Sequence, residues 1–152
     1  MSESLFAPFM REALALAENG RWSACPNPTV GAVLVRDGRV VARGWHHAAG
    51  QPHAEVECLR DAQRQGIDPA QCTLVVTLEP CNHYGKTPPC SEAVLAAGIR
   101  RVVIGLHDPT PKAAGGAERL RAAARREAQD LRRRGGGGVA VFEFRHERHA
   151  LH

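Results

Sequence analysis

The stretch Thr73-Leu74-Val75-Val76-Thr77-Leu78-Glu79-Pro80-Cys81 lies near the middle of the 152-residue chain and decides how the rest is organised. Its first six residues are mostly apolar or β-branched, with few polar breaks. This pattern predicts a central strand over 73–78 that is buried on both faces. Ligands bind outside the carboxyl ends of strands in open α/β sheets, so the strand delivers Glu79-Pro80-Cys81 to the place where a site is expected.

The segments on either side alternate between helical and extended patterns. Asp37-Gly38 is a two-residue hairpin signal, and Pro26-Asn27-Pro28 predicts a loop. The alternation predicts an α/β sandwich around a mixed sheet. Helices are expected over 5–19, 54–65, 92–97 (opened by Cys90 and Ser91) and 116–134, and strands over 30–35, 39–43, 73–78, 101–106 and 139–144.

Two expectations concern packing within these elements. The helix over 54–65 should turn Val56, Leu59 and Ala62 inward and end at Gly66. Gly31 has no side chain, so another group can approach the backbone closely at the start of its strand. A strand-end glycine that meets no ligand is an equal alternative.

Length and composition point to a single domain over residues 1–152. No run approaches the ~18 apolar residues of a membrane span, and the N-terminus lacks a basic region followed by an apolar one, so no membrane contact is expected. Five cysteines, an odd number, predict a reducing cytoplasm rather than a disulfide framework. Cys25, Cys58 and Cys72 are expected to be ordinary packing residues.

The net charge of +4 is concentrated in one segment. Residues 112–134 hold eight basic and three acidic side chains, so this segment is +5 and the remainder of the chain is −1. A solvated helix face is favoured over a nucleic-acid surface there. The 5% aromatic content also argues against a stacking surface for nucleic acid.

The residue types around the central strand suggest a zinc site. His53, Cys81 and Cys90 offer three zinc ligands, one fewer than the four that close a structural site. Such a site leaves a coordination position for water, whose pKa the metal lowers towards neutrality. Glu55 lies two residues from His53 at the same helix start and is the expected proton carrier. Cys90 opens a helix, where the dipole favours a thiolate.

Four motifs resemble the deaminase domain of the riboflavin biosynthesis proteins, within the cytidine deaminase-like superfamily. The longest runs from Glu79-Pro80-Cys81 to Pro88-Pro89-Cys90, a Cys-x8-Cys spacing in place of the Cys-x-x-Cys of many zinc deaminases. The other three lie at 26–33, 50–56 and 97–103, and the likeness covers about residues 10–122.

The resemblance implies a three-layer α/β/α cytidine deaminase-like fold with a central mixed five-stranded sheet. It implies one zinc per chain held by His53, Cys81 and Cys90, with Glu55 as proton shuttle. The implied reaction is hydrolytic deamination of 2,5-diamino-6-ribosylamino-4-pyrimidinone 5′-phosphate, a small phosphorylated pyrimidine, by a homo-oligomeric enzyme. The positions that match the family's substrate pocket are Asn27, His46, His83, Lys86 and Asp108.

Two features depart from the family pattern. Thr110 stands where the family usually has Asn in Asp-Pro-Asn-Pro. Beyond Arg121 the chain continues into an arginine-rich helix and a four-glycine run, so 123–152 is an atypical tail and no reductase domain is expected within 1–152. Two other functions stay open: a deaminase of another small base or nucleoside, of the cytidine or guanine type, and a catalytically silent zinc-stabilised binding module.

Overall fold

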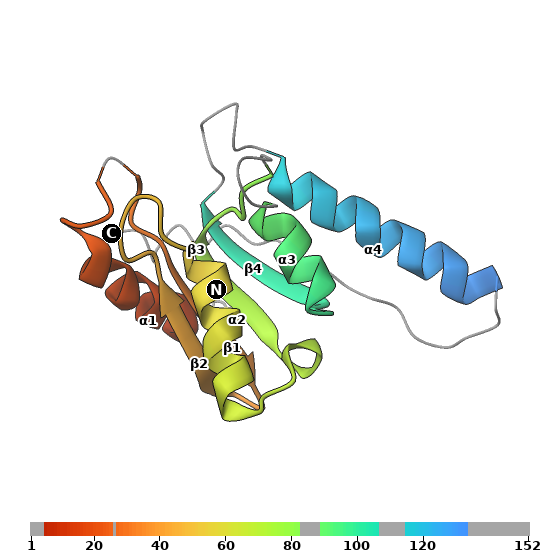
Figure 1. The fold of residues 1–152 in the computed structure, drawn as a ribbon. Coiled ribbons are helices and arrows are strands. Elements are labelled where there is room, and N and C mark those ends of the chain that lie inside the picture. The colour runs from red at the N-terminus through yellow and green to blue at the C-terminus, as the bar shows by residue number, and fades with distance from the viewer. Residues whose placement is uncertain (1–4, 26, 83–88, 107–114, 134–152) are drawn as a thin grey trace.

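The computed structural model of the chain describes residues 5–25, 27–82, 89–106 and 115–133 (Figure 1). In chain order the elements are α1 (Ala7–Ala17), η1 (Glu18–Gly20), β1 (Gly31–Arg36), β2 (Arg39–Trp45), α2 (Ala54–Gln65), η2 (Pro69–Gln71), β3 (Thr73–Leu78), α3 (Cys90–Ala96), β4 (Arg101–Leu106) and α4 (Gly116–Arg133).

The strands form one mixed sheet in the order β2-β1-β3-β4. β1 is antiparallel to both β2 and β3, whereas β3 and β4 are parallel. The β1–β2 hairpin turns at Asp37 and Gly38, which both have positive φ, as the sequence predicted. The described ranges contain four strands, so the expected count of five is corrected to four for them. The fifth predicted strand, 139–144, lies outside the described residues.

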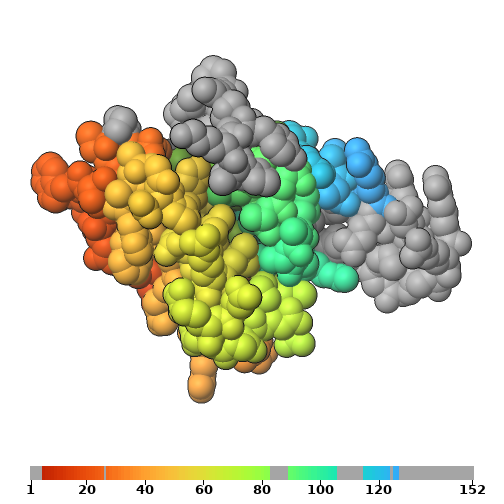
Figure 2. Space-filling view, in the orientation of Figure 1, coloured from red at the N-terminus to blue at the C-terminus, as the bar shows by residue number. Residues whose placement is uncertain are grey.

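Helices cover both faces of the sheet, and alternate residues along each inner strand divide between the two layers. On β3, Val75 packs against α1 with Val33 and Val103, whereas Leu74 and Val76 face the other helices. β3 is therefore buried on both faces, which confirms the prediction from its sequence. In Figure 1, α2 and α3 lie in front of the sheet and α1 behind it, and Figure 2 shows α2 and α3 covering the front face.

Most predicted boundaries are confirmed within a few residues. The ranges of α2, β3 and β4 agree with the sequence predictions, and Gly66 ends α2 with a left-handed φ of 72°. The first helix is shorter than predicted: it begins at Ala7, and its predicted end is a separate 3-10 turn. α3 begins at Cys90, the residue predicted to open it, and ends at Ala96, one residue before the predicted end.

The prediction for the inner face of α2 was partly wrong. Ala62 is buried as expected, but Val56 and Leu59 are only partly buried. Glu55 and Cys58 occupy the buried face, and Leu59 packs against the core from its edge. The helix therefore turns a carboxyl group towards the interior in its first turn, next to the fully buried Ala54.

Two glycines let helix backbones approach the sheet closely. A Cβ at Gly31 would lie 1.9 Å from the carbonyl oxygen of Ala13 in α1, so the group that approaches Gly31 is a helix of the chain itself. A Cβ at Gly44 would lie 2.3 Å from the backbone nitrogen of Cys58 in α2. These contacts set the distance of α1 and α2 from the β1–β2 hairpin.

The packing role predicted for three cysteines holds for two of them. Cys58 and Cys72 are buried, and burial raises the pKa of each thiol. Cys25 is exposed, so the prediction was wrong for this residue. It lies in the turn region that follows η1, where no core element covers it.

Within the ranges that the structure describes, no helix combines the length and apolar character needed to cross a membrane.

We predict that Gly44→Ala lowers the free energy of unfolding by about 3 kcal/mol, because the added methyl group meets the backbone of α2 rather than a movable side chain. Gly66→Ala is the matched control. Nothing lies within 4 Å of its added Cβ, so only the strain of positive φ remains, which costs about 1 kcal/mol. Urea unfolding of both variants measures the difference, and equal losses would contradict the packing argument.

Candidate metal centre and active site

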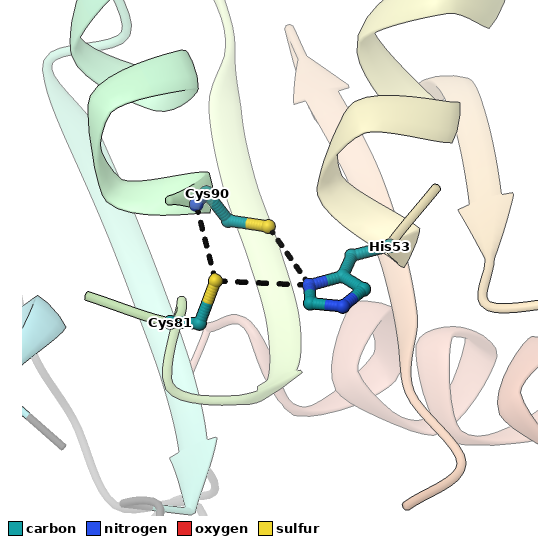
Figure 3. A group of neighbouring side chains, drawn as sticks. All are labelled: His53, Cys81 and Cys90. Atoms are coloured by element: carbon teal, nitrogen blue, oxygen red, sulfur yellow. Dashed lines mark hydrogen bonds between the residues drawn. The ribbon is translucent and has the colours of Figure 1, made fainter. Parts of the chain in front are cut away.

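Three elements bring one ligand side chain each to the carboxyl end of β3. His53 is the N-cap of α2, Cys81 follows β3 by three residues, and Cys90 is the first residue of α3. Their side chains point toward one another (Figure 3). The site therefore forms where the sheet edge meets the starts of two helices, as the position of Glu79-Pro80-Cys81 predicted.

The distances between the three side chains fit a single zinc ion. His53 Nδ1 lies 3.2 Å from Cys90 Sγ and 3.7 Å from Cys81 Sγ, and all three ligand atoms are within 4.8 Å of one another. Tetrahedral zinc with bonds of ~2.3 Å to sulfur and ~2.1 Å to nitrogen separates such ligands by about 3.6 Å. One imidazole and two thiols are also donors that zinc prefers, so the residues fit the metal.

Burial within the cluster is graded. Cys90 is 4% exposed, Cys81 is intermediate and His53 is exposed. Solvent and small molecules can therefore reach the cluster from the side of His53. Three protein ligands with one side open to solvent would leave a bound zinc ion a position for water, which is the arrangement of catalytic rather than structural sites.

The protein itself stabilises a thiolate at Cys81, without any contribution from a metal ion. Hydrogen bonding from the Cys90 side chain is the main cause that lowers the pKa of Cys81 to about 4, and the His53 side chain and the Cys90 backbone also contribute. That backbone N–H donates to Cys81 Sγ at 3.2 Å, from the positive end of α3. The shared proton raises the pKa of Cys90, and the bond to Cys81 raises the pKa of His53.

The loop after β3 is held to α3 by two further hydrogen bonds. The Ser91 backbone N–H donates to the carbonyl oxygen of Cys81 at 3.1 Å, and the Ser91 hydroxyl donates to Asn82 Oδ1 at 3.0 Å. Ser91 is fully buried, so water does not compete strongly for the groups that make these two hydrogen bonds. Cys81 is thus bound to the start of α3 through both its side chain and its backbone.

Glu55 lies in the first turn of α2 and is 3% exposed. Burial is the largest effect on its carboxyl group and raises its pKa to about 7, although its own backbone N–H and His53 favour the charged form. The carboxyl group also interacts with the Cys90 thiol. A carboxyl group with a pKa close to neutrality, beside a metal-ligand cluster, is suited to both accepting and returning a proton.

His46 and Asn27 form a hydrogen-bonded pair beside this cluster. His46 is 3% exposed, and its ring lies edge-on to the ring of His53 at 5.2 Å between centroids. His46 Nδ1 is 3.0 Å from the Pro52 carbonyl oxygen, which can only accept, so Nδ1 carries the proton. His46 Nε2 is then the acceptor for the Asn27 amide at 3.1 Å. Both ring nitrogens of His46 are therefore occupied by the protein, while Asn27 is exposed.

The remaining predicted pocket residues cannot be placed. His83, Lys86 and Asp108 lie outside the described residues, as does Thr110. Their assignment to a substrate pocket stays a prediction.

Sequence reasoning missed the part that Glu79 plays next to the cluster. Glu79 is 6% exposed, and its Oε2 accepts a hydrogen bond of 2.8 Å from the Ala117 backbone N–H at the start of α4. The signal for it was in the sequence: a carboxylate follows an apolar strand directly and must find a partner once it is buried. What the sequence did not show is that one partner, the Ala117 backbone, lies 38 residues away.

The family model described as "Cytidine and deoxycytidylate deaminase zinc-binding region" matches residues 6–106. The matched range holds β1 to β4 together with His53, Glu55, Cys81 and Cys90.

Relatives are similar over the same region. The riboflavin biosynthesis protein RibD of Escherichia coli is 51% identical over 107 residues, which are 70% of this chain and 28% of that protein. A diaminohydroxyphosphoribosylamino-pyrimidine deaminase of Buchnera aphidicola is 47% identical over 107 residues, 70% of this chain and 71% of that protein. The chain thus spans less than a third of the first relative and over two thirds of the second.

A solved structure shows the same fold. The deaminase/reductase of Thermotoga maritima matches with a TM-score of 0.75 and 47% identity, over 78% of this chain and 34% of that one. The α/β cytidine deaminase-like fold expected from the motifs is therefore confirmed.

We predict that the purified chain binds one zinc ion and that Cys81→Ser abolishes tight binding, because a three-ligand site that loses a thiolate keeps only two ligands. Metal analysis after dialysis measures the stoichiometry. Cys25→Ser is the control, since that thiol is exposed and outside the cluster. Zinc retained at one per chain in Cys81→Ser would show that the metal lies elsewhere.

Proposed function

The chain belongs to the zinc-binding cytidine and deoxycytidylate deaminase family, and we propose that it hydrolytically deaminates 2,5-diamino-6-ribosylamino-4-pyrimidinone 5′-phosphate in riboflavin biosynthesis. The observation that carries the proposal is a buried carboxyl group beside a His-Cys-Cys cluster, in a chain of which 70% is about half identical to proteins named for this deamination and pathway. His53, Cys81 and Cys90 are the proposed zinc ligands, and Glu55 is the proposed catalytic acid and base.

Zinc supplies Lewis-acid activation of a water molecule when it is bound, by lowering the pKa of that water towards neutrality. The protein's own part is to move protons. Glu55 accepts one proton from the attacking water and passes it to the ring nitrogen, then accepts the second proton from the same oxygen and passes it to the departing amine. The water oxygen ends on the ring carbon, the carbon–nitrogen bond breaks and ammonia leaves. A pKa of about 7 matches this double role, since the carboxyl group can take and give a proton near neutral pH.

Asn27 is the described residue best suited to contact the pyrimidine ring. Its amide nitrogen donates to His46, and this hydrogen bond fixes the orientation of the amide group. Asn27 Oδ1 is left to accept a hydrogen bond from a ring or exocyclic N–H. His46 then acts through Asn27 and Pro52 rather than by direct contact, because both of its ring nitrogens are occupied.

Two alternatives predict different behaviour from the same structure. A deaminase of the cytidine or guanine type would share the zinc site and Glu55 but would release ammonia from an unphosphorylated base or nucleoside. A zinc-stabilised binding module would hold the metal and release no ammonia from any of them. The burial of the Glu55 carboxyl group beside the His-Cys-Cys cluster favours an enzyme, since a purely structural site gains nothing from it. Homo-oligomerisation and a cytoplasmic location stay predictions.

We predict that the zinc-loaded chain releases ammonia from the phosphorylated diaminopyrimidine faster than from cytidine or guanine, and that Glu55→Gln retains zinc while kcat falls by about 10²–10⁴-fold. The amide keeps the shape of the side chain but cannot accept the proton. Ammonia release and metal content are measured on the same samples. Turnover of cytidine or guanine alone would exclude the proposed substrate, and full activity in Glu55→Gln would exclude the proposed proton carrier.

A second prediction concerns recognition. Asn27→Ala should raise KM by about tenfold, the effect of losing one hydrogen bond of ~1.4 kcal/mol, with a smaller change in kcat. His46→Ala should also raise KM, because Asn27 loses the group that orients it. The double variant should be no worse than Asn27→Ala, since the two residues act as one unit. Additive effects would instead indicate that His46 contacts the substrate itself.

A further inference from the structure

A contact between Glu79 and the start of α4 is used by none of the roles described above. Glu79 follows β3 directly, and its carboxylate accepts the Ala117 backbone N–H at 2.8 Å. Ala117 is the second residue of an 18-residue helix, so the carboxylate lies at the positive end of the helix dipole. The pairing compensates a carboxylate that is almost entirely removed from water.

Gly116 and Pro80, the residues next to Ala117 and Glu79, are also in close contact. A Cβ at Gly116 would lie 1.8 Å from the carbonyl oxygen of Pro80, so the backbone of α4 touches the residue between Glu79 and Cys81. Pro80 itself is fully buried. Only hydrogen fits at Gly116 without moving either the helix or the loop.

The other side of this loop is held by α3. Cys81 Sγ accepts the Cys90 backbone N–H, and the Cys81 carbonyl oxygen accepts the Ser91 backbone N–H. The Glu79-Pro80-Cys81 segment is therefore held between two helix N-termini, with Glu79 bound to α4 and Cys81 to α3. A ligand side chain in such a segment keeps its place only while both ends are fixed.

We propose that Glu79 is a positioning residue for the zinc site: by fastening α4 to the loop after β3, it holds Cys81 where the thiolate meets His53 and Cys90. The inference rests on the proposed three-residue zinc site and is independent of the identity of the substrate. It makes α4 a part of the metal centre, although none of the side chains that the structure describes in this helix belongs to the ligand cluster.

The test measures zinc affinity in the full chain by competition with a chelator. Glu79→Ala should weaken zinc binding by about 10–100-fold, the range seen when a group that orients a metal ligand is removed. It should also alter the thiolate-to-metal absorption of the cobalt-substituted protein. Glu79→Gln keeps an acceptor oxygen and should recover most of the affinity. The matched control is Glu118→Gln, which removes a charge from the same helix turn but is 68% exposed and should change neither readout.

A second variant disturbs the contact between α4 and the loop after β3 by changing α4 instead of the loop. Gly116→Ala leaves Glu79 intact but drives a methyl group into the Pro80 carbonyl, and it should also weaken zinc binding by at least tenfold. If Glu79→Ala does not fold, the zinc affinity of Gly116→Ala provides the test instead. Unchanged zinc affinity in a folded Glu79→Ala protein, or in Gly116→Ala, would overturn the proposal and leave Glu79 as a helix cap only.

Cys81→Ser in the same assay separates this inference from the site on which it rests. If Cys81→Ser retains full zinc affinity, the proposed zinc site is itself wrong. If Cys81→Ser loses zinc while Glu79→Ala does not, the site stands and the positioning role fails.

Discussion

The hydrogen bond from the Cys90 backbone N–H to Cys81 Sγ is the interaction on which the site depends. It joins the first residue of α3 to the loop that leaves β3, an inner strand of the sheet that is buried on both faces. Because the donor lies at a helix N-terminus, the bond favours the thiolate form of Cys81 and fixes its direction at the same time. The loop that follows β3 therefore forms one side of the candidate metal centre.

The remaining ligands depend on how closely the helices approach the sheet. Gly44 in β2 allows α2 to pack with its backbone against the strand, and the first turn of α2 carries both His53 and Glu55. β3 supplies Cys81 from between β1 and β4. The centre therefore combines two separately packed helices and one central strand, and a change in either helix position is expected to alter the metal geometry before it alters the fold.

Much of this arrangement could be predicted from local sequence. The apolar run at 73–78, the Asp37-Gly38 turn and the His-x-Glu at a helix start each carry a local physical signal, and all were placed correctly. The partners of Glu79 and His46 could not be predicted, because Ala117 and Asn27 are distant in sequence and only tertiary packing brings them together. The inward turn of Glu55 was missed because hydrophobicity patterns assign aliphatic residues to the core first.

The zinc coordination itself is the measurement that tests the central claim most directly. X-ray absorption spectroscopy at the zinc edge, on the metal-loaded chain, should show two sulfur ligands at ~2.3 Å and two nitrogen or oxygen ligands at ~2.0–2.1 Å, one from His53 and one exchangeable. The exchangeable ligand should respond to a small anion added to the sample. A shell of three or four sulfurs, or a coordination sphere that no small molecule can enter, would contradict a catalytic centre built from His53, Cys81 and Cys90.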